Sequence, residues 1–245
     1  MIEEAAVMPL QHLRFPDESD AYRKARNALL EREMELRRMV EAIAAQRREL
    51  PPGGLVSREY AFTGLAGPVK FSQLFKPGKD TLAVYSFMFG PERETPCTGC
   101  THFLDAIDGE VRHIDHRINF VVVAKSPIER LAALAKQRGW TGLHLLSTDG
   151  NSYDKDYFGD SRGLTAEVRA QQEFKPGEEW DMPMLNIFRR DGAKIRHFWG
   201  SELLYLPPEE GQEYRHNDQL DPLWNMLDLT PEGRGDFHPQ LNYAD

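Results

Sequence analysis

Residues 81–89 (TLAVYSFMF) form a nearly continuous run that favours β-structure, and Cys97 and Cys100 follow after a loop of seven residues. Such a run is typical of a strand covered on both faces, and we expect a helix over residues 97–107. The two cysteines are the only ones among 245 residues. Thiols at this spacing can close a small disulfide ring or share a metal ion. The chain therefore needs a fold that brings the end of a buried strand to the start of a helix.

Further strands and helices alternate along the chain. Ser126 and Pro127 resemble an N-cap followed by proline at the first helical position, which predicts a helix that ends at Arg138. Asp191-Gly192 favours a type I′ turn and predicts a hairpin. The expected strands span residues 56–62, 69–74, 81–89, 118–124, 143–147, 185–190 and 194–199. This order predicts an α/β fold with a thioredoxin-like core, a mixed sheet flanked by helices, and an insertion at about 149–180.

The N-terminal segment predicts one long helix over residues 19–50. An N-cap at Ser19 or Asp20 begins it, and the sequence PPGG at 51–54 stops it. Apolar residues recur every seven positions, so one face carries an apolar stripe; its members are Tyr22, Leu29, Leu36 and Ile43, widened by Ala25, Met39 and Val40. The stripe favours either docking on the same chain or formation of a homodimer.

Composition bounds the class of protein. The net charge of −9 argues against nucleic acid as the main partner, and residues 201–245 alone carry ten acidic and two basic side chains. The longest aliphatic run, residues 120–124, is far too short to span a membrane. The start, MIEEAAVM, lacks the basic region of a signal peptide. We therefore expect a cytoplasmic protein with an N-terminal helical segment (1–54), a thioredoxin-like domain (55–206) and an acidic extension packed on the core (207–245).

The position of the two cysteines predicts reactivity. A cysteine at a helix start faces unpaired backbone N–H groups and the positive end of the helix dipole. Both favour thiolate over thiol, so the thiol pKa falls. We expect Cys97 to be exposed and to attack disulfides, and Cys100, one turn inward, to resolve the mixed disulfide. In a cytoplasmic protein such a pair is more often catalytic or metal-binding than structural.

A second element supports redox chemistry. Met182 and Pro183 stand immediately before the expected strand at 185–190. Proline is tolerated at a strand entry, where its peptide bond can be cis. Thioredoxin-like proteins place a cis-proline at this point, packed against the cysteine pair. The resemblance implies a cis Met182–Pro183 bond, with both residues facing the sulfurs and receiving the substrate backbone.

A metal site is the alternative reading of the cysteines. His113 and His116 follow Cys100 at a spacing one residue short of the zinc-finger pattern, and His102 lies inside the expected helix. The histidines of a finger lie on a helix, however, whereas His116 leads directly into an expected strand. The chain is also acidic and large enough to fold without zinc. We expect no bound metal and no cofactor, with a metal-binding or metal-delivery protein as the alternative.

Several stretches together resemble the thioredoxin-like family catalogued as domain of unknown function 899. They are RRELPPGG at the end of the long helix, YSFMFGPERETPCTGCTHFLDAIDG, INFVVVAK and the closing LDLTPEGRG, and the resemblance covers residues 15–237. It implies a thioredoxin-like fold and a dithiol–disulfide oxidoreductase whose redox pair is Cys97 and Cys100. The chain lacks the tryptophan that precedes the first cysteine of true thioredoxins, and the Gly-Pro between the two.

The function expected from the sequence is thus thiol–disulfide exchange through Cys97 and Cys100. Peroxide reduction is a variant, because a low-pKa cysteine beside a resolving thiol also suits sulfenic acid chemistry. The expected partners are a disulfide-containing protein or a small thiol or peroxide, and a second copy of the chain, with no nucleic acid and no membrane. A thioredoxin-fold interaction module, in which the cysteines are incidental, is a third class.

Overall fold

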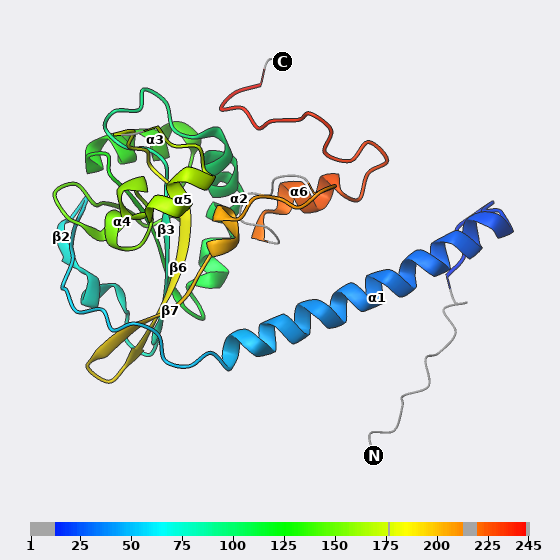
Figure 1. Ribbon diagram of the computed structural model, residues 1–245, viewed down its shortest axis with the longest axis horizontal. Coiled ribbons are helices and arrows are strands. Elements are labelled where there is room, and N and C mark those ends of the chain that lie inside the picture. Colours follow the sequence, from blue (N-terminus) through cyan, green and yellow to red (C-terminus); the bar gives the residue numbers. More distant parts are fainter. Residues whose placement is uncertain (1–12, 176, 213–219, 244–245) are drawn as a thin grey trace. The chain divides into compact units, whose positions relative to one another are not determined.

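The computed structural model describes residues 13–175, 177–212 and 220–243. The chain divides into two compact units, one ending at Pro51 and the other beginning at Pro52 (Figure 1). In the described part of the chain, no helix has both the length and the apolar character that a membrane crossing requires.

The first unit is dominated by α1, Asp20–Arg48, which confirms the expected long N-terminal helix. Ser19 caps it, because its hydroxyl accepts a hydrogen bond from the backbone N–H of Tyr22 at 3.1 Å. The apolar stripe is half exposed, with Leu36 at 59%. The expected homodimer stays a prediction.

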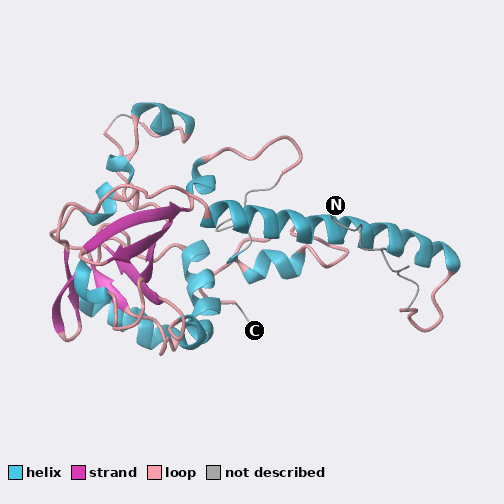
Figure 2. Cartoon of the chain, turned by 90° about the horizontal axis from the view of Figure 1, so that it is seen from below, coloured by secondary structure: helices cyan, strands magenta, loops and turns pink. Residues whose placement is uncertain are grey.

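The second unit is built on a seven-stranded sheet (Figure 2). The central strands β3, β4 and β5 are parallel, and β6 and β7 add an antiparallel hairpin beside β3. At the other edge, β1 and β2 form a hairpin against β5. In sheet order the strands are β2 (Gly67–Lys70), β1 (Ala61–Gly64), β5 (Leu145–Ser147), β4 (Asn119–Ala124), β3 (Thr81–Ser86), β6 (Met184–Asp191) and β7 (Lys194–Gly200).

The helices of this unit connect and cover the strands. They are α2 (Thr98–Ile114), α3 (Ile128–Arg138), α4 (Tyr153–Asp156), α5 (Ala166–Gln171) and α6 (Pro222–Leu227), with 3₁₀ turns at Phe71–Leu74, Ser161–Gly163 and Glu202–Tyr205. The strand before α2 is central, the strand after α2 runs parallel to it, and an antiparallel hairpin follows on its other side. This arrangement is the thioredoxin-like core that the element order predicts.

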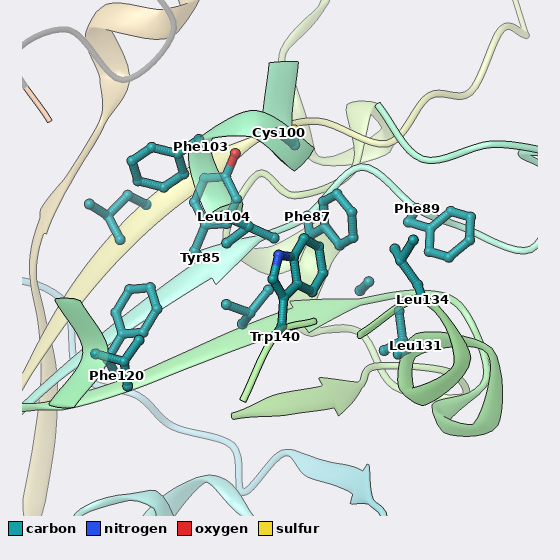
Figure 3. Packing of buried hydrophobic residues seen from close by; sticks show 14 of the residues in the cluster. Tyr85, Phe87, Phe89, Cys100, Phe103, Leu104, Phe120, Leu131, Leu134 and Trp140 are labelled. Carbon is teal, nitrogen blue, oxygen red and sulfur yellow. The ribbon is translucent and has the colours of Figure 1, made fainter. Parts of the chain in front are cut away.

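Both faces of β3 are buried, as its sequence predicts. Ala83 and Tyr85 point to one side and Leu82 and Val84 to the other, because side chains alternate along a strand. The first face packs against α2 and α3 (Figure 3); residues in this cluster include Cys100, Phe103, Leu104, Leu131 and Leu134. The second face packs against aromatic side chains, among them Phe62, Phe71, Tyr153 and Phe188. Burial on both faces holds the end of β3 in place.

The element boundaries differ from expectation at the first hairpin. The strands expected at 56–62 and 69–74 are shorter and shifted, and residues Phe71–Leu74 form a 3₁₀ turn. Gly67 adopts a φ of +114° at the hairpin turn, which moves the second strand to an earlier start. Phe71 turns inward to the aromatic cluster. Tertiary packing overrides the strand preference of these residues.

Two helix boundaries also differ. α2 runs to Ile114, seven residues beyond the expected end, because its later turns still bury an apolar residue, Val111. The N-cap of α3 is Pro127, and Ser126 lies one residue earlier with its backbone N–H bonded to the carbonyl of Phe89. The expected hairpin at Asp191-Gly192 is confirmed, with Gly192 at a φ of +57°.

The acidic C-terminal extension contacts the core through α6. The ring Nε2 of His102, on α2, lies 2.7 Å from a carboxylate oxygen of the fully buried Asp221. The ring of His102 also meets the ring of Trp224 edge-on. Beyond α6, the guanidinium of Arg138 donates to the backbone carbonyl of Leu241. Residues of α6 and its N-cap thus contact the helix that carries the cysteines.

Candidate active site

Cys97 is the N-cap residue of α2 and is fixed by its backbone. Its N–H donates to the carbonyl of Met88 at 3.1 Å, which ties the helix start to the loop after β3. Its own carbonyl accepts from the backbone N–H of Thr101 at 2.9 Å and from the Thr101 hydroxyl at 2.7 Å. The side chain is partly buried. The sulfur therefore stands at the first turn of α2, where backbone N–H groups are unpaired.

The surroundings of Cys97 lower the pKa of its thiol from the ordinary 9.0 to about 6. The largest cause is a hydrogen bond from the Cys100 thiol, followed by the backbone N–H of Cys100 and, after it, the positive charge of Arg93 and the N–H of Gly99. Burial opposes them. The thiol, the two N–H groups and the arginine all stabilise the negative sulfur. At neutral pH Cys97 is mainly a thiolate.

Cys100 has the opposite character. Its side chain is fully buried in the cluster under α2. Burial raises the pKa of its thiol well above the ordinary 9.0, and the hydrogen bond to Cys97 and the charge of Cys97 raise it further. The Tyr85 hydroxyl, which Figure 3 shows beneath the turn that carries Cys100, acts in the other direction. Cys100 is therefore a protonated thiol that donates to the Cys97 sulfur.

Arg130, in the first turn of α3, holds the loop that leads to Cys97. Its guanidinium donates to the carbonyls of Gly90 at 3.0 Å and Glu94 at 3.1 Å, and also to the carbonyl of Arg93. It lies over the ring of Phe89, 4.1 Å from the centroid. Four contacts from one planar group fix the backbone that carries Arg93. Nothing in the sequence distinguishes this arginine from the other charged residues of its helix.

Replacement of Arg130 tests this positioning role. We expect Arg130→Lys to raise the midpoint of the pH dependence of Cys97 alkylation. A lysine has one ammonium and cannot reach several carbonyls from one plane, so Arg93 is no longer held beside the thiolate. The rate of iodoacetamide labelling at pH 6 should fall several-fold.

The exposed Lys136, on the same helix, provides a matched control. Lys136→Gln should leave the midpoint unchanged. An unaltered midpoint in Arg130→Lys, with native circular dichroism, would contradict the role.

Met182 and Pro183 lead into β6, beside the end of β3. The peptide bond between them is trans, so the prediction of a cis bond is wrong. The Met182 N–H donates to the carbonyl of Gly159 at 3.0 Å, and an antiparallel bridge joins Asp181 to Asp160. These contacts extend the backbone before Pro183, and a trans bond continues that direction into β6. Met182 packs against a cluster other than that of the cysteines, and substrate binding by these two residues stays a prediction.

The structure does not assemble the alternative metal site. His113 lies in the last turn of α2, whereas Cys97 caps its first turn, so about 24 Å of helix separates them at 1.5 Å per residue. His102 is engaged by Asp221. Within the described residues, no group of three or more histidine, cysteine or acidic side chains could hold a metal ion.

A charged network that sequence reasoning missed borders the same loop. Lys125, directly after β4, lies 2.8 Å from a carboxylate oxygen of Asp160 and 2.6 Å from one of Asp181. Asp181 also accepts from the backbone N–H of Gly90 at 2.5 Å. A Cβ atom at Gly90 would stand 2.6 Å from that carboxylate, so only glycine fits there. The network ties the residue before Met182 to the loop that leads to Cys97.

A cavity of about 620 Å³ opens beside this network. Its innermost acid is Asp154, which accepts from the hydroxyls of Thr148 and Ser86, the latter at 3.2 Å. Burial raises the pKa of Asp154 to about 6, against the effect of these two hydrogen bonds.

A dithiol at the start of the helix that follows the central strand of this sheet defines a thioredoxin-like protein. The chain belongs to the family described as "Bacterial protein of unknown function (DUF899)", which matches residues 14–244. This confirms the family resemblance that the sequence motifs carry. No curated protein matches the chain.

Three solved structures resemble part of this chain. Peroxidoxin BcpB from Mycobacterium tuberculosis is 18% identical, with a TM-score of 0.43 over 62% of this chain and 85% of that one. A peroxiredoxin-like protein from Aquifex aeolicus is 12% identical, with a TM-score of 0.42 over 73% of this chain and 88% of that one. BsSco, a member of the Sco family of cytochrome c oxidase assembly proteins, is 12% identical, with a TM-score of 0.37 over 61% of this chain and 85% of that one.

Proposed function

We propose that this protein is a thiol–disulfide oxidoreductase in which Cys97 is the nucleophile and Cys100 the resolving thiol. The observation that carries the proposal is the opposite ionisation of two hydrogen-bonded thiols at one helix start. Cys97 has a pKa of about 6, and Cys100 has a pKa well above the ordinary value. Disulfide exchange needs a thiolate to attack and a second thiol to complete the transfer.

The reaction has two steps. The Cys97 thiolate attacks one sulfur of a substrate disulfide, a bond forms between the two sulfurs, and the first substrate half leaves as a thiolate that takes a proton from water. Cys100 then loses its proton and attacks the Cys97 sulfur, which releases the second half as a thiol. The substrate is reduced to two thiols, and the protein is oxidised to a Cys97–Cys100 disulfide. A dithiol reductant returns the protein to its starting state.

The experiment uses reduced protein and a small disulfide. Cys100→Ser should accumulate a stable mixed disulfide at Cys97, visible by mass spectrometry, because no second thiol resolves it. Cys97→Ser should form almost none, since the remaining thiol is buried and protonated. Thr98→Ala, an exposed change between the two cysteines, is the matched control and should react as the natural chain does.

The same samples distinguish the classes of substrate. If hydrogen peroxide oxidises Cys97 faster than any disulfide does and yields a trapped sulfenic acid in Cys100→Ser, the protein is a peroxide reductase. If neither oxidant reacts with Cys97 faster than with a free thiol, the proposal is wrong. If cells that carry Cys97→Ser behave as cells with the natural chain do, the protein is better explained as an interaction module in which the cysteines are incidental.

A further inference from the structure

The cavity beside the network lies at the carboxyl ends of three parallel strands. Its walls include residues 90–93, which follow β3, together with Lys125 after β4 and Thr148 after β5. Ligands in open α/β sheets bind at this edge, outside the carboxyl ends of the strands. Small-molecule sites have volumes of about 300–1,000 Å³, and a cavity of about 620 Å³ falls within that range. The place and the volume fit a small ligand.

Charges of both signs line the cavity. Lys125 is neutralised by Asp160 and Asp181. Arg93, Lys155 and Asp149 form no ion pair with another residue of the described chain, so both signs remain available. A wall with unpaired positive and negative groups favours a ligand that carries an ammonium and a carboxylate over one with a single sign of charge.

The cavity and the thiolate share the loop between β3 and α2. Arg93 belongs to the cavity wall, and its charge also stabilises the negative sulfur of Cys97. Two hydrogen bonds fix the loop at Gly90: its N–H donates to the carboxylate of Asp181, and its carbonyl accepts from the guanidinium of Arg130. A ligand seated in the cavity therefore stands within electrostatic range of the nucleophile, against a preformed wall.

We propose that this cavity binds the charged ends of a small zwitterionic disulfide, one built from amino-acid-derived thiols, and so sets the substrate class of the enzyme. This inference rests on the proposed function. Asp149 offers a partner for the ammonium, and Lys155 and Arg93 offer partners for the carboxylate; Arg93 lies in the loop that leads to Cys97. The electron transfer is the exchange described above: the substrate disulfide gains two electrons from the two cysteines, one proton from Cys100 and one from water, and the Cys97–Cys100 disulfide forms.

The test is a single turnover of reduced protein without added reductant. The oxidants are cystine and glutathione disulfide (zwitterionic), cystamine (cationic), 3,3′-dithiodipropionate (anionic) and 2-hydroxyethyl disulfide (neutral). Each rate is divided by the rate of the same disulfide with dithiothreitol, which removes differences in intrinsic reactivity. We expect a normalised rate at least about tenfold higher for a zwitterionic disulfide than for the neutral one.

Two exposed residues of the wall allow the site to be changed without risk to the core. Lys155→Gln and Asp149→Asn should each slow the zwitterionic disulfide about fivefold and leave the neutral one unchanged, because each removes one unpaired charge. Lys136→Gln, outside this cavity, should change neither rate.

Equal normalised rates for all the disulfides, or variants that leave the zwitterionic rate unchanged, would overturn the proposal. So would a disulfide-bonded protein that reacts faster than every small disulfide. These outcomes leave the proposed function standing, because Cys97 still reacts. Failure of every disulfide to oxidise Cys97 would instead refute the proposed function.

Discussion

Cys97 will be alkylated by iodoacetamide with a pH midpoint of about 6 and far faster than Cys100. At pH 7 a thiol with a pKa of about 6 is about 90% thiolate, whereas Cys100, whose pKa lies well above 9.0, is less than about 1% thiolate. The fraction of thiolate therefore strongly favours Cys97. A thiolate of low pKa is a weaker nucleophile, which offsets only part of this advantage. Full burial of Cys100 adds to the difference by excluding the reagent.

The measurement is mass-resolved labelling of the two peptides between pH 4 and pH 9. Because the pKa of Cys97 is lowered, its labelling rate should rise as the pH passes 6 and stay constant above pH 8. Cys100→Ala provides the decisive variant, since it removes the largest cause of the shift and should move the midpoint upward. Equal, slow labelling of both cysteines, with a midpoint near 9, would refute the proposed division of roles.

Replacement of Lys125 should give the largest loss of stability. Lys125→Met should lower the free energy of unfolding by about 3 kcal/mol at pH 7, because it leaves buried carboxylates without their shared counter-ion. Asp160 and Asp181 are at most 8% exposed. Methionine keeps all but the terminal atom of the side-chain length, so the change reports mainly on charge rather than on a cavity. Urea unfolding followed by circular dichroism measures the difference.

The pH dependence provides a check on the cause. Hydrogen bonds from Arg162 and Lys125 hold the pKa of Asp160 at about 2, below its ordinary 3.8, although burial acts to raise it. A lowered folded pKa stabilises the fold above pH 3.8, and this contribution is lost as pH falls toward 2. The two proteins should therefore converge in stability between pH 4 and pH 2. Lys155→Met, at an exposed lysine without an ion pair, should change stability by less than about 0.5 kcal/mol. A constant difference down to pH 2 would contradict the electrostatic cause.

Local patterns in the sequence predict most of the core. The strand expected at 81–89 is found at Thr81–Ser86, three residues shorter, the one expected at 118–124 is found at Asn119–Ala124, and the Asp191-Gly192 turn is as expected, because burial and turn chemistry act within a few residues. The two cysteines also lie where the helix start was predicted. Their spacing and their place at a helix start are local features, so the sequence alone indicated them, whereas burial, Tyr85 and Arg93 also act on the two thiols.

Features that depend on contacts between residues distant in the sequence were not predicted correctly. The Met182–Pro183 bond is trans because Gly159 and Asp160 hold the preceding backbone. Arg130 meets a loop about forty residues earlier, and no local pattern marks it. The first hairpin shifted because aromatic packing outweighs the weak strand preference of short segments.

The amino-acid sequence by itself determined the order of elements, the dithiol and its place at a helix start, because these follow from short-range periodicity and spacing. Only the tertiary structure decided how strongly the two thiols differ, what holds their loop, and where the charged cavity lies. Those properties depend on burial and on charges brought together from β3, β4, β6 and the insertion. The burial of a side chain and the electrostatic potential around it depend on residues that are distant in the sequence, so no single segment determines them.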